Sequence, residues 1–149
     1  MRYLILLTAL WMLNSACGPK SDGLEELNMR TVKLPDGTEI RAELAVTPLD
    51  VQKGMMFRDS LERGRGMLFI HEKPGTYSYW MYNVKIPLDM IWMDRDHRVV
   101  EIAANAQPCK TKASQCPTYG GHQQALYVLE LGGGEAQRLH LREGQTLEF

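Results

Sequence analysis

Asp89 is the residue whose type and position point most directly to chemistry. It lies in the segment 88–93, where all the remaining residues are apolar. If this segment is a strand, side chains alternate between its two faces, and Asp89 shares a face with Ile91 and Met93. A carboxylate in such surroundings costs free energy unless it is paired or hydrogen-bonded. The sequence therefore predicts either a structural acceptor, for turn amides or for Arg58, or an acid or base in a pocket.

Three further residues complete a candidate cleft around Asp89. Arg58 follows a short predicted helix, and Trp80 and Asn83 lie in the mostly apolar and aromatic stretch 79–83. A guanidinium, an indole, an amide and a carboxylate suit a small polar ligand, a glycan or an envelope protein. We predict that these four residues form a ligand-binding cleft.

Signatures of enzymes are mostly absent. The chain has no Gly-x-Ser-x-Gly, no His-Glu-x-x-His and no phosphate-binding glycine loop. One catalytic alternative stays open, a hydrolase-like enzyme that uses Asp89 as acid or base with Glu130 as a second carboxylate. The histidines are isolated from one another, and we expect neither a metal site nor a cofactor. They are His71, His97, His122 and His140.

Methionines are concentrated in the central third of the chain, at Met55, Met56, Met67, Met81, Met90 and Met93. Their thioethers are soft ligands that suit Cu(I). Most of these positions fall within predicted strands, where methionine fills irregular gaps in a core. We therefore expect them to pack in the core.

Cys109 and Cys116 are separated by six residues in a stretch with the composition of a loop. We predict a disulfide between them, which the chain-entropy account values at roughly 2.5 kcal/mol. Zinc pairs favour two to four intervening residues, and catalytic redox pairs usually have two. Metal binding and redox catalysis are therefore the weaker alternatives.

The first sixteen residues resemble a secretory signal peptide. Arg2 precedes an apolar run of eleven residues, 3–13, which is shorter than the roughly 20 residues of a membrane span. Ser15 and Ala16 then precede Cys17, an arrangement that resembles the bacterial lipobox, where the cysteine becomes diacylated. Cleavage after Ala16 without lipidation is the alternative.

Lipidation of Cys17 would account for an odd number of cysteines in an exported protein. Because Gly18 rather than Asp follows the cysteine, the start of the mature chain resembles lipoproteins sent to the outer membrane. We expect a signal peptide at 1–16, a lipidated cysteine and flexible tether at 17–29, and a domain at 30–149. The expected location is the bacterial cell envelope, at the periplasmic face of the outer membrane.

The elements that position these side chains read as one β-rich domain. Asp36-Gly37 predicts a hairpin turn between strands at 31–34 and 38–46. Thr47-Pro48 predicts the start of a short helix. Spacing of about ten residues between later strands favours a compact antiparallel sandwich or barrel with one or two short helices. Those strands are predicted at 66–70, 77–82, 88–93, 99–104, 125–131 and 146–149, with a helical turn or two within 135–141.

Five motifs in this chain, in this order, resemble the bacterial and archaeal domain-of-unknown-function 192 family. They are Gly-Met-Met-Phe-Arg at 54–58, Gly-Met-Leu-Phe at 66–69, Trp-Met-Tyr-Asn at 80–83, Ile-Pro-Leu-Asp-Met-Ile-Trp at 86–92 and Tyr-Val-Leu-Glu-Leu at 127–131. The resemblance covers about residues 32–149. It implies a compact, mostly β sandwich or barrel with a short helix, and it brings no established activity.

Charge excludes one class of partner. The chain has 17 basic and 18 acidic residues, a net charge of −1, whereas proteins that bind nucleic acid backbones normally carry an excess of Lys and Arg. Taken together, the sequence predicts a non-catalytic binding module that is held to a membrane through an N-terminal lipid.

Overall fold

The computed structural model describes residues 28–149. The predicted signal peptide, Cys17 and nearly all of the predicted tether lie outside the described residues. Strand β1 begins at Met29, so the last residue assigned to the tether already belongs to the sheet.

The predicted hairpin is confirmed. Strands β1 (Met29–Lys33) and β2 (Glu39–Ala45) pair antiparallel, and Gly37 in the turn has a φ of 85°, which glycine adopts without strain. Along β2 the buried side chains of Ile40 and Ala42 alternate with exposed ones.

The predicted helix start is also confirmed. Helix α2 (Pro48–Lys53) is capped by Thr47, whose side chain accepts a hydrogen bond from the Asp50 amide while Asp50 reaches back to the Thr47 amide. None of its residues is buried. Gly54 ends the helix, and a Cβ there would lie 3.2 Å from the Phe69 ring.

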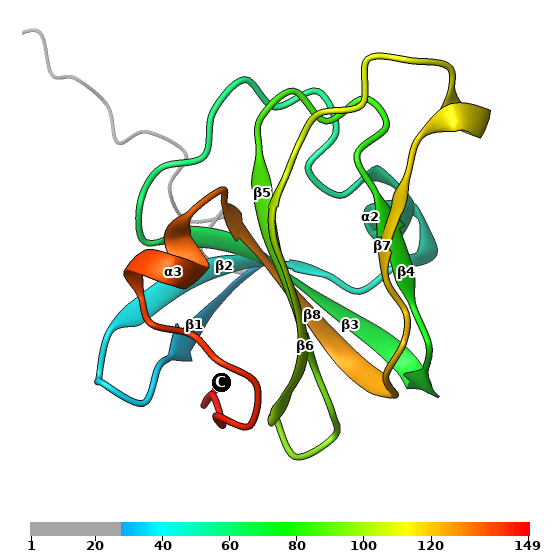
Figure 1. Ribbon diagram of the computed structural model, residues 1–149. Helices are drawn as coiled ribbons and strands as arrows, with labels where there is room; N and C mark the ends of the chain where they lie inside the picture. Colours follow the sequence, from blue (N-terminus) through cyan, green and yellow to red (C-terminus); the bar gives the residue numbers. More distant parts are fainter. Residues whose placement is uncertain (1–27) are drawn as a thin grey trace, which may run out of the picture.

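A six-stranded sheet forms the centre of the molecule (Figure 1), which confirms the prediction of a mainly β domain. Its order is β1-β2-β3-β8-β5-β6, and β2 and β3 run parallel while the other neighbours are antiparallel. The sheet within residues 28–149 is open rather than a closed barrel. The remaining strands are β3 (Arg65–Gly75), β5 (Leu88–Met93), β6 (Val99–Ala106) and β8 (Ala125–Gly132).

A second, two-stranded ribbon pairs β4 (Ser78–Trp80) with β7 (Thr118–Gly120). Figure 1 shows it at one side of the large sheet, below a loop that contains the short 3-10 helix η1 (Ala113–Gln115). The sequence did not predict β7. It packs tightly on the sheet, because a Cβ at Gly120 would overlap the indole of Trp92.

The sheet separates two cores. The α3-side core contains Leu68, Ile91 and Leu129 and is covered by the short helix α3 (Glu135–Arg138) and the residues that follow it. The ribbon-side core contains Phe69 and Trp92 and is covered by the ribbon and the segment after α2. Five of the six central methionines are buried in these cores, which confirms the packing prediction. They are Met55, Met67, Met81 and Met90 on the ribbon side and Met93 on the α3 side.

The predicted helical turn within 135–141 is confirmed, because α3 spans Glu135–Arg138. The predicted strand 146–149 is replaced by isolated bridges from Thr146 and Glu148. The disulfide between Cys109 and Cys116 is present.

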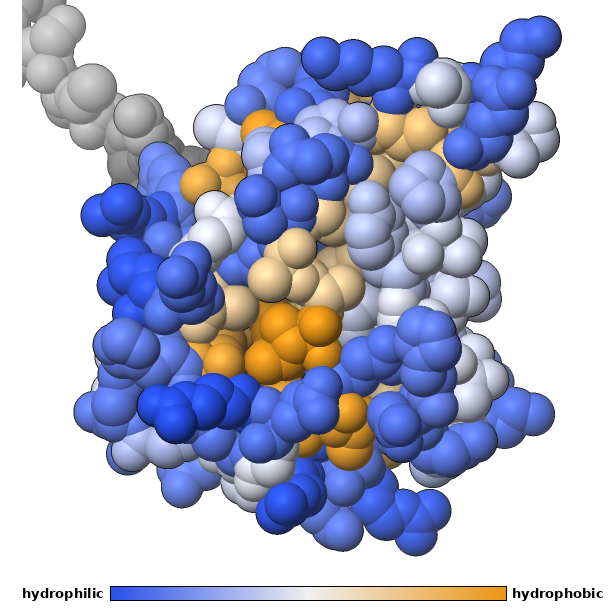
Figure 2. Space-filling model, viewed as in Figure 1, coloured by the Kyte–Doolittle hydropathy of each residue, from blue (hydrophilic) through white to orange (hydrophobic). Residues whose placement is uncertain are grey.

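The surface that carries α3 and β6 is mostly hydrophilic, with an apolar area between these two elements (Figure 2). Within the described part of the chain, no helix is long and apolar enough to cross a membrane.

Candidate functional site

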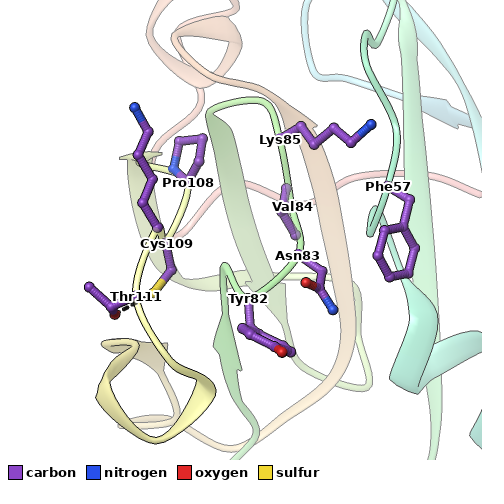
Figure 3. A pocket seen from close by; sticks show the side chains of 9 residues that line it. Phe57, Tyr82, Asn83, Val84, Lys85, Pro108, Cys109 and Thr111 are labelled. Atoms are coloured by element: carbon purple, nitrogen blue, oxygen red, sulfur yellow. Dashed lines mark hydrogen bonds between the residues drawn. The ribbon is translucent and has the colours of Figure 1, made fainter.

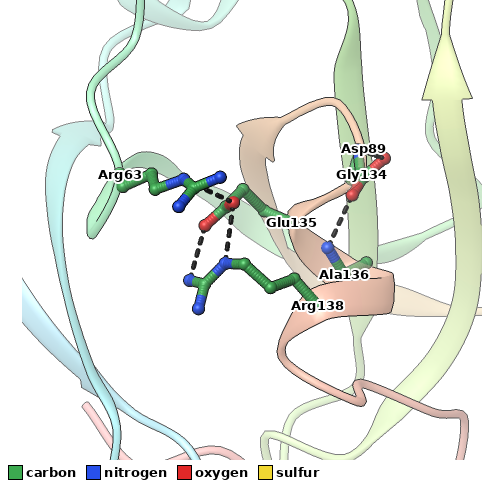
Figure 4. A network of polar contacts seen from close by, with 6 residues as sticks. All are labelled: Arg63, Asp89, Gly134, Glu135, Ala136 and Arg138. Atoms are coloured by element: carbon green, nitrogen blue, oxygen red, sulfur yellow. Dashed lines mark hydrogen bonds and ion pairs between the residues drawn. The ribbon is translucent and has the colours of Figure 1, made fainter.

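Asp89 is fully buried on the α3 side of the sheet, together with Ile91 and Met93, as the alternation predicted. Its carboxylate accepts backbone hydrogen bonds from Asn105 at 2.6 Å, Ala136 at 2.6 Å and Gly134 at 3.1 Å. Figure 4 shows it beside the start of α3. Gly134, the N-cap, has no side chain to cap the helix, so Asp89 supplies the acceptor from a neighbouring strand. These contacts are those of a structural acceptor for turn amides.

Arg58 does not contact Asp89. Its guanidinium makes two hydrogen bonds to the Glu43 carboxylate, at 2.5 and 2.6 Å, in the bidentate arrangement that favours arginine. Those bonds hold the pKa of the Glu43 carboxyl below its usual range. Glu43 is opposite Met67 in register, and Met67 is opposite Glu130, so Arg58 lies on the ribbon side of the sheet.

Glu130 is the second buried carboxyl group, with 4% of its surface exposed. Burial raises its pKa to about 8, although the positive charge of Arg58 lowers it in part. Its Oε2 atom has no hydrogen-bond partner among the described residues. Its neighbours in register, Met67 and Met90, offer only thioethers.

Tyr79 lies near this carboxyl, and His71 lies next to Tyr79. The Tyr79 hydroxyl and the His71 Nε2 atom are 3.1 Å apart. Burial raises the pKa of Tyr79, and the charge of Glu130 adds to that effect. Burial lowers the pKa of His71. Tyr79 and His71 therefore form a half-buried polar pair against the apolar core.

The two candidate catalytic carboxyls do not face each other. Met90 is opposite Glu130 in register and Asp89 is opposite Leu131, so their side chains enter opposite faces of the sheet. A two-carboxylate hydrolytic site needs both groups on either side of one bond. The structure does not bring Asp89 and Glu130 together in that way.

A pocket of about 470 Å³ lies at the ribbon end of the molecule (Figure 3). It is lined by Phe57, Tyr82, Asn83, Val84, Lys85, Pro108, Cys109, Lys110 and Thr111. Of the four residues predicted for the cleft, only Asn83 lines it. Trp80 lies beside it, with its ring 5.3 Å from that of Tyr82.

Asn83 has the geometry of a binding residue. Its amide points between the rings of Tyr82 and Phe57 in Figure 3 and makes no hydrogen bond within residues 28–149. A half-buried amide with a free donor and a free acceptor between two aromatic rings suits a ligand with hydroxyl or amide groups.

The backbone holds this arrangement in a conformation that most residues avoid. Phe57 and Asn83 have φ values of 66° and 58°, and the Phe57 amide donates to the Asn83 carbonyl at 2.9 Å. Asparagine tolerates this region, whereas it is costly for a bulky side chain such as phenylalanine. Strain of this kind is concentrated at binding sites in proteins. The loops that contain Phe57 and Asn83 are joined by this hydrogen bond.

Sequence reasoning missed most of the pocket. Phe57 and Tyr82 are part of the motifs quoted above, but aromatic residues in a β-rich chain read as core. Lys110 and Thr111 come from the disulfide loop. They line the same pocket as Asn83 because Cys109 forms a β-bridge with Tyr82 and its amide donates to the Met81 carbonyl. No spacing along the chain signals that contact.

The described residues hold no group of three or more His, Cys, Asp or Glu side chains that could bind a metal ion.

Comparison with known proteins gives a family and similar solved structures, among them the two that follow. The model of the domain-of-unknown-function 192 family, described as "Uncharacterized ACR", matches residues 31–149. A protein of unknown function from Novosphingobium aromaticivorans is 36% identical, with a TM-score of 0.74 over 81% of this chain and 85% of its own. A protein from Sinorhizobium meliloti, described as a candidate transcription regulator, is 31% identical, with a TM-score of 0.70 over 79% of this chain and 89% of its own. No curated protein matches.

Proposed function

Because the chain belongs to the domain-of-unknown-function 192 family, whose description names no activity, we propose from the pocket itself that the protein is a non-catalytic binding module for a small polar ligand, and specifically for a glycan. The observation that carries the proposal is the Asn83 amide, free of internal hydrogen bonds and placed between two aromatic rings.

The chemistry of the pocket suits a sugar. Sugar rings present apolar C–H faces that stack on aromatic rings, and hydroxyl or acetamido groups that pair with an amide. Phe57 and Tyr82 supply the aromatic rings, and Asn83 and Thr111 supply polar groups. A volume of about 470 Å³ is within the range of small-ligand pockets.

We also propose that this module is a lipoprotein of the bacterial envelope, attached through Cys17 at the periplasmic face of the outer membrane. The support is the sequence of residues 1–18, with its short apolar run and its small residues before the cysteine. The disulfide between Cys109 and Cys116 is consistent with an oxidising compartment.

The hydrolase-like alternative with Asp89 as acid or base has less support. All three hydrogen bonds to the Asp89 carboxylate come from backbone amides, and the side chain has no exposed surface. A substrate would have to displace the start of α3 to reach it.

The proposal is tested by titrating the mature protein with the disaccharide of N-acetylglucosamine, followed by NMR and native mass spectrometry. We expect chemical-shift changes at Tyr82, Asn83 and Thr111. Asn83→Asp keeps the side-chain shape and the tolerance for positive φ but loses the amide donor. We expect it to weaken binding about tenfold, which corresponds to one hydrogen bond.

The matched control is Asn105→Asp, at another asparagine with positive φ, 52°, outside the pocket. It should bind like the unmodified protein. Equal binding by both variants, or shift changes confined to residues away from the pocket, would refute a role for Asn83.

A further inference from the structure

Large exposed hydrophobic side chains are few and grouped. Within residues 28–149 they are Val46, Leu49, Phe57 and Trp80, and Leu49 is 72% exposed. The first three lie in the connection from β2 to β3, on and around α2. Helix α2 packs on the ribbon-side core through the partly buried Val51 and presents Leu49 outward to solvent.

Trp80 joins this group through the pocket. Its ring packs on Tyr82, and Tyr82 and Phe57 line the same pocket. The hydrogen bond from the Phe57 amide to the Asn83 carbonyl ties the segment after α2 to the segment after β4. The exposed hydrophobic residues therefore border one region of the surface.

The chain enters the described domain beside the same region. Asn28 exchanges two hydrogen bonds with Leu44, at 2.9 and 3.1 Å, and Val46 follows Leu44 by two residues. Ten residues, 18–27, separate Asn28 from Cys17. Asn28 follows Cys17 by eleven residue steps, which reach at most about 40 Å when fully extended, so a lipid on Cys17 would keep Asn28 within that distance of the bilayer.

We propose that Val46, Leu49, Phe57 and Trp80 form a membrane-docking surface that enters the headgroup region of the bilayer holding the Cys17 lipid. The inference rests on the proposed lipid anchor. The anchor keeps the surface close to the bilayer, so a modest apolar contact suffices to orient the domain. Moving exposed leucine, valine and aromatic side chains out of water lowers the free energy, and tryptophan favours the interface between lipid and water.

Docking in this way has a consequence for the proposed ligand site. Phe57 belongs both to the docking surface and to the pocket lining, so the pocket would open near the membrane surface. Its ligand would then be a glycan presented close to the inner surface of the outer membrane.

Trp80 provides the test. The mature protein is reconstituted by its anchor into phosphatidylcholine vesicles whose acyl chains carry bromine, which quenches nearby tryptophan fluorescence. Trp92 is fully buried, and Trp80→Phe gives its background signal. We expect strong quenching of the Trp80 emission, unchanged by salt because the contact is apolar.

Leu49→Glu places a charge in the proposed contact without disturbing a buried residue, and we expect it to abolish most of the quenching. Gln123→Glu adds the same charge at an exposed position in the β7–β8 connection and should leave the quenching unchanged. No quenching of anchored protein, or equal quenching in both variants, overturns the docking surface.

The anchor itself is checked separately by intact mass. Protein without a diacyl mass refutes the proposed anchoring, whereas diacylated protein with an unquenched Trp80 refutes only the docking. If cross-linking shows that a second copy of the chain protects Leu49 instead, the membrane proposal is also wrong.

Discussion

Asp89 and Glu130 lie one register position apart on the neighbouring strands β5 and β8, and their side chains enter opposite faces of the sheet. Both are buried, with 0% and 4% of their surfaces exposed. Three backbone amides surround the Asp89 carboxylate, whereas an oxygen of Glu130 has no partner in the described chain and burial raises the pKa of that carboxyl to about 8.

The difference shows that two equally buried carboxyl groups can differ in the free-energy cost of their burial. A carboxylate that accepts amide hydrogen bonds recovers much of its lost hydration, and one that meets thioethers does not. On the α3 side, the start of a helix supplies donors that need an acceptor. On the ribbon side, Glu130 has Met67 and Met90 as its neighbours in register. Asp89 therefore stabilises the fold through its three amide hydrogen bonds, and Glu130 is tolerated as a neutral group.

Asp89→Asn replaces the carboxylate that accepts the three backbone amides, and it should have the largest effect on stability. The new NH2 group faces amide donors, and buried donors without acceptors are costly. We expect a loss of about 4 kcal/mol in the free energy of unfolding, a large part of the stability of a small domain. Chemical denaturation measures it.

The control is Asp94→Asn, which also removes a carboxylate that accepts two backbone amides, but in the exposed turn after β5. We expect a loss of at most about 1 kcal/mol there, because water replaces the lost contacts. Similar losses for both variants would mean that burial of the Asp89 amides has no special weight.

The comparison also shows which parts of the site the sequence could predict. Local signals predicted the hairpin at Asp36-Gly37 and the cap at Thr47, because those structures depend on neighbouring residues. Alternation predicted the face of Asp89 correctly. The disulfide followed from counting cysteines and from the loop between them.

Contacts between distant segments could not be read from the sequence. The donors to Asp89 come from 16 to 47 residues away, and the Glu43 partner of Arg58 lies 15 residues before it. Arg58 and Asp89 both looked like members of one cleft because each is polar in an apolar setting. The sheet instead assigns them to different faces, which depends on a strand order that spacing alone does not define.

Glu130→Gln tests whether Glu130 is neutral in the folded protein, through the pH dependence of the free energy of unfolding. In the folded protein Glu130 stays protonated up to about pH 8, whereas in the unfolded chain it ionises near its ordinary pKa of 4.5. The folded state thus binds one more proton between these values, so the free energy of unfolding falls as pH rises, by up to about 1.4 kcal/mol per pH unit. Above the folded pKa the loss is complete.

Glutamine cannot ionise, so this loss should disappear in the variant. We expect Glu130→Gln to be about 4 kcal/mol more stable than the unmodified protein at pH 8, and the advantage to vanish once the pH falls below the unfolded pKa of 4.5. Denaturant titrations across this range measure the difference, which cancels the contributions of other groups. A difference that does not change with pH would show that Glu130 is ionised in the folded state.

Among the described residues, Arg58 is the charge that counters the burial of Glu130, and we expect Arg58→Met to have the smallest effect. The positive charge of Arg58 lowers the pKa of Glu130, so its removal should raise that pKa. NMR of the Glu130 carboxyl carbon against pH measures the shift directly.

Arg138→Met is the control, because Arg138 makes a similar bidentate pair with Glu135 on α3, near Asp89 (Figure 4). It should leave the Glu130 titration unchanged, since the sheet lies between them. If Arg138→Met moves the Glu130 midpoint as far as Arg58→Met does, the two faces of the sheet are not electrostatically separate.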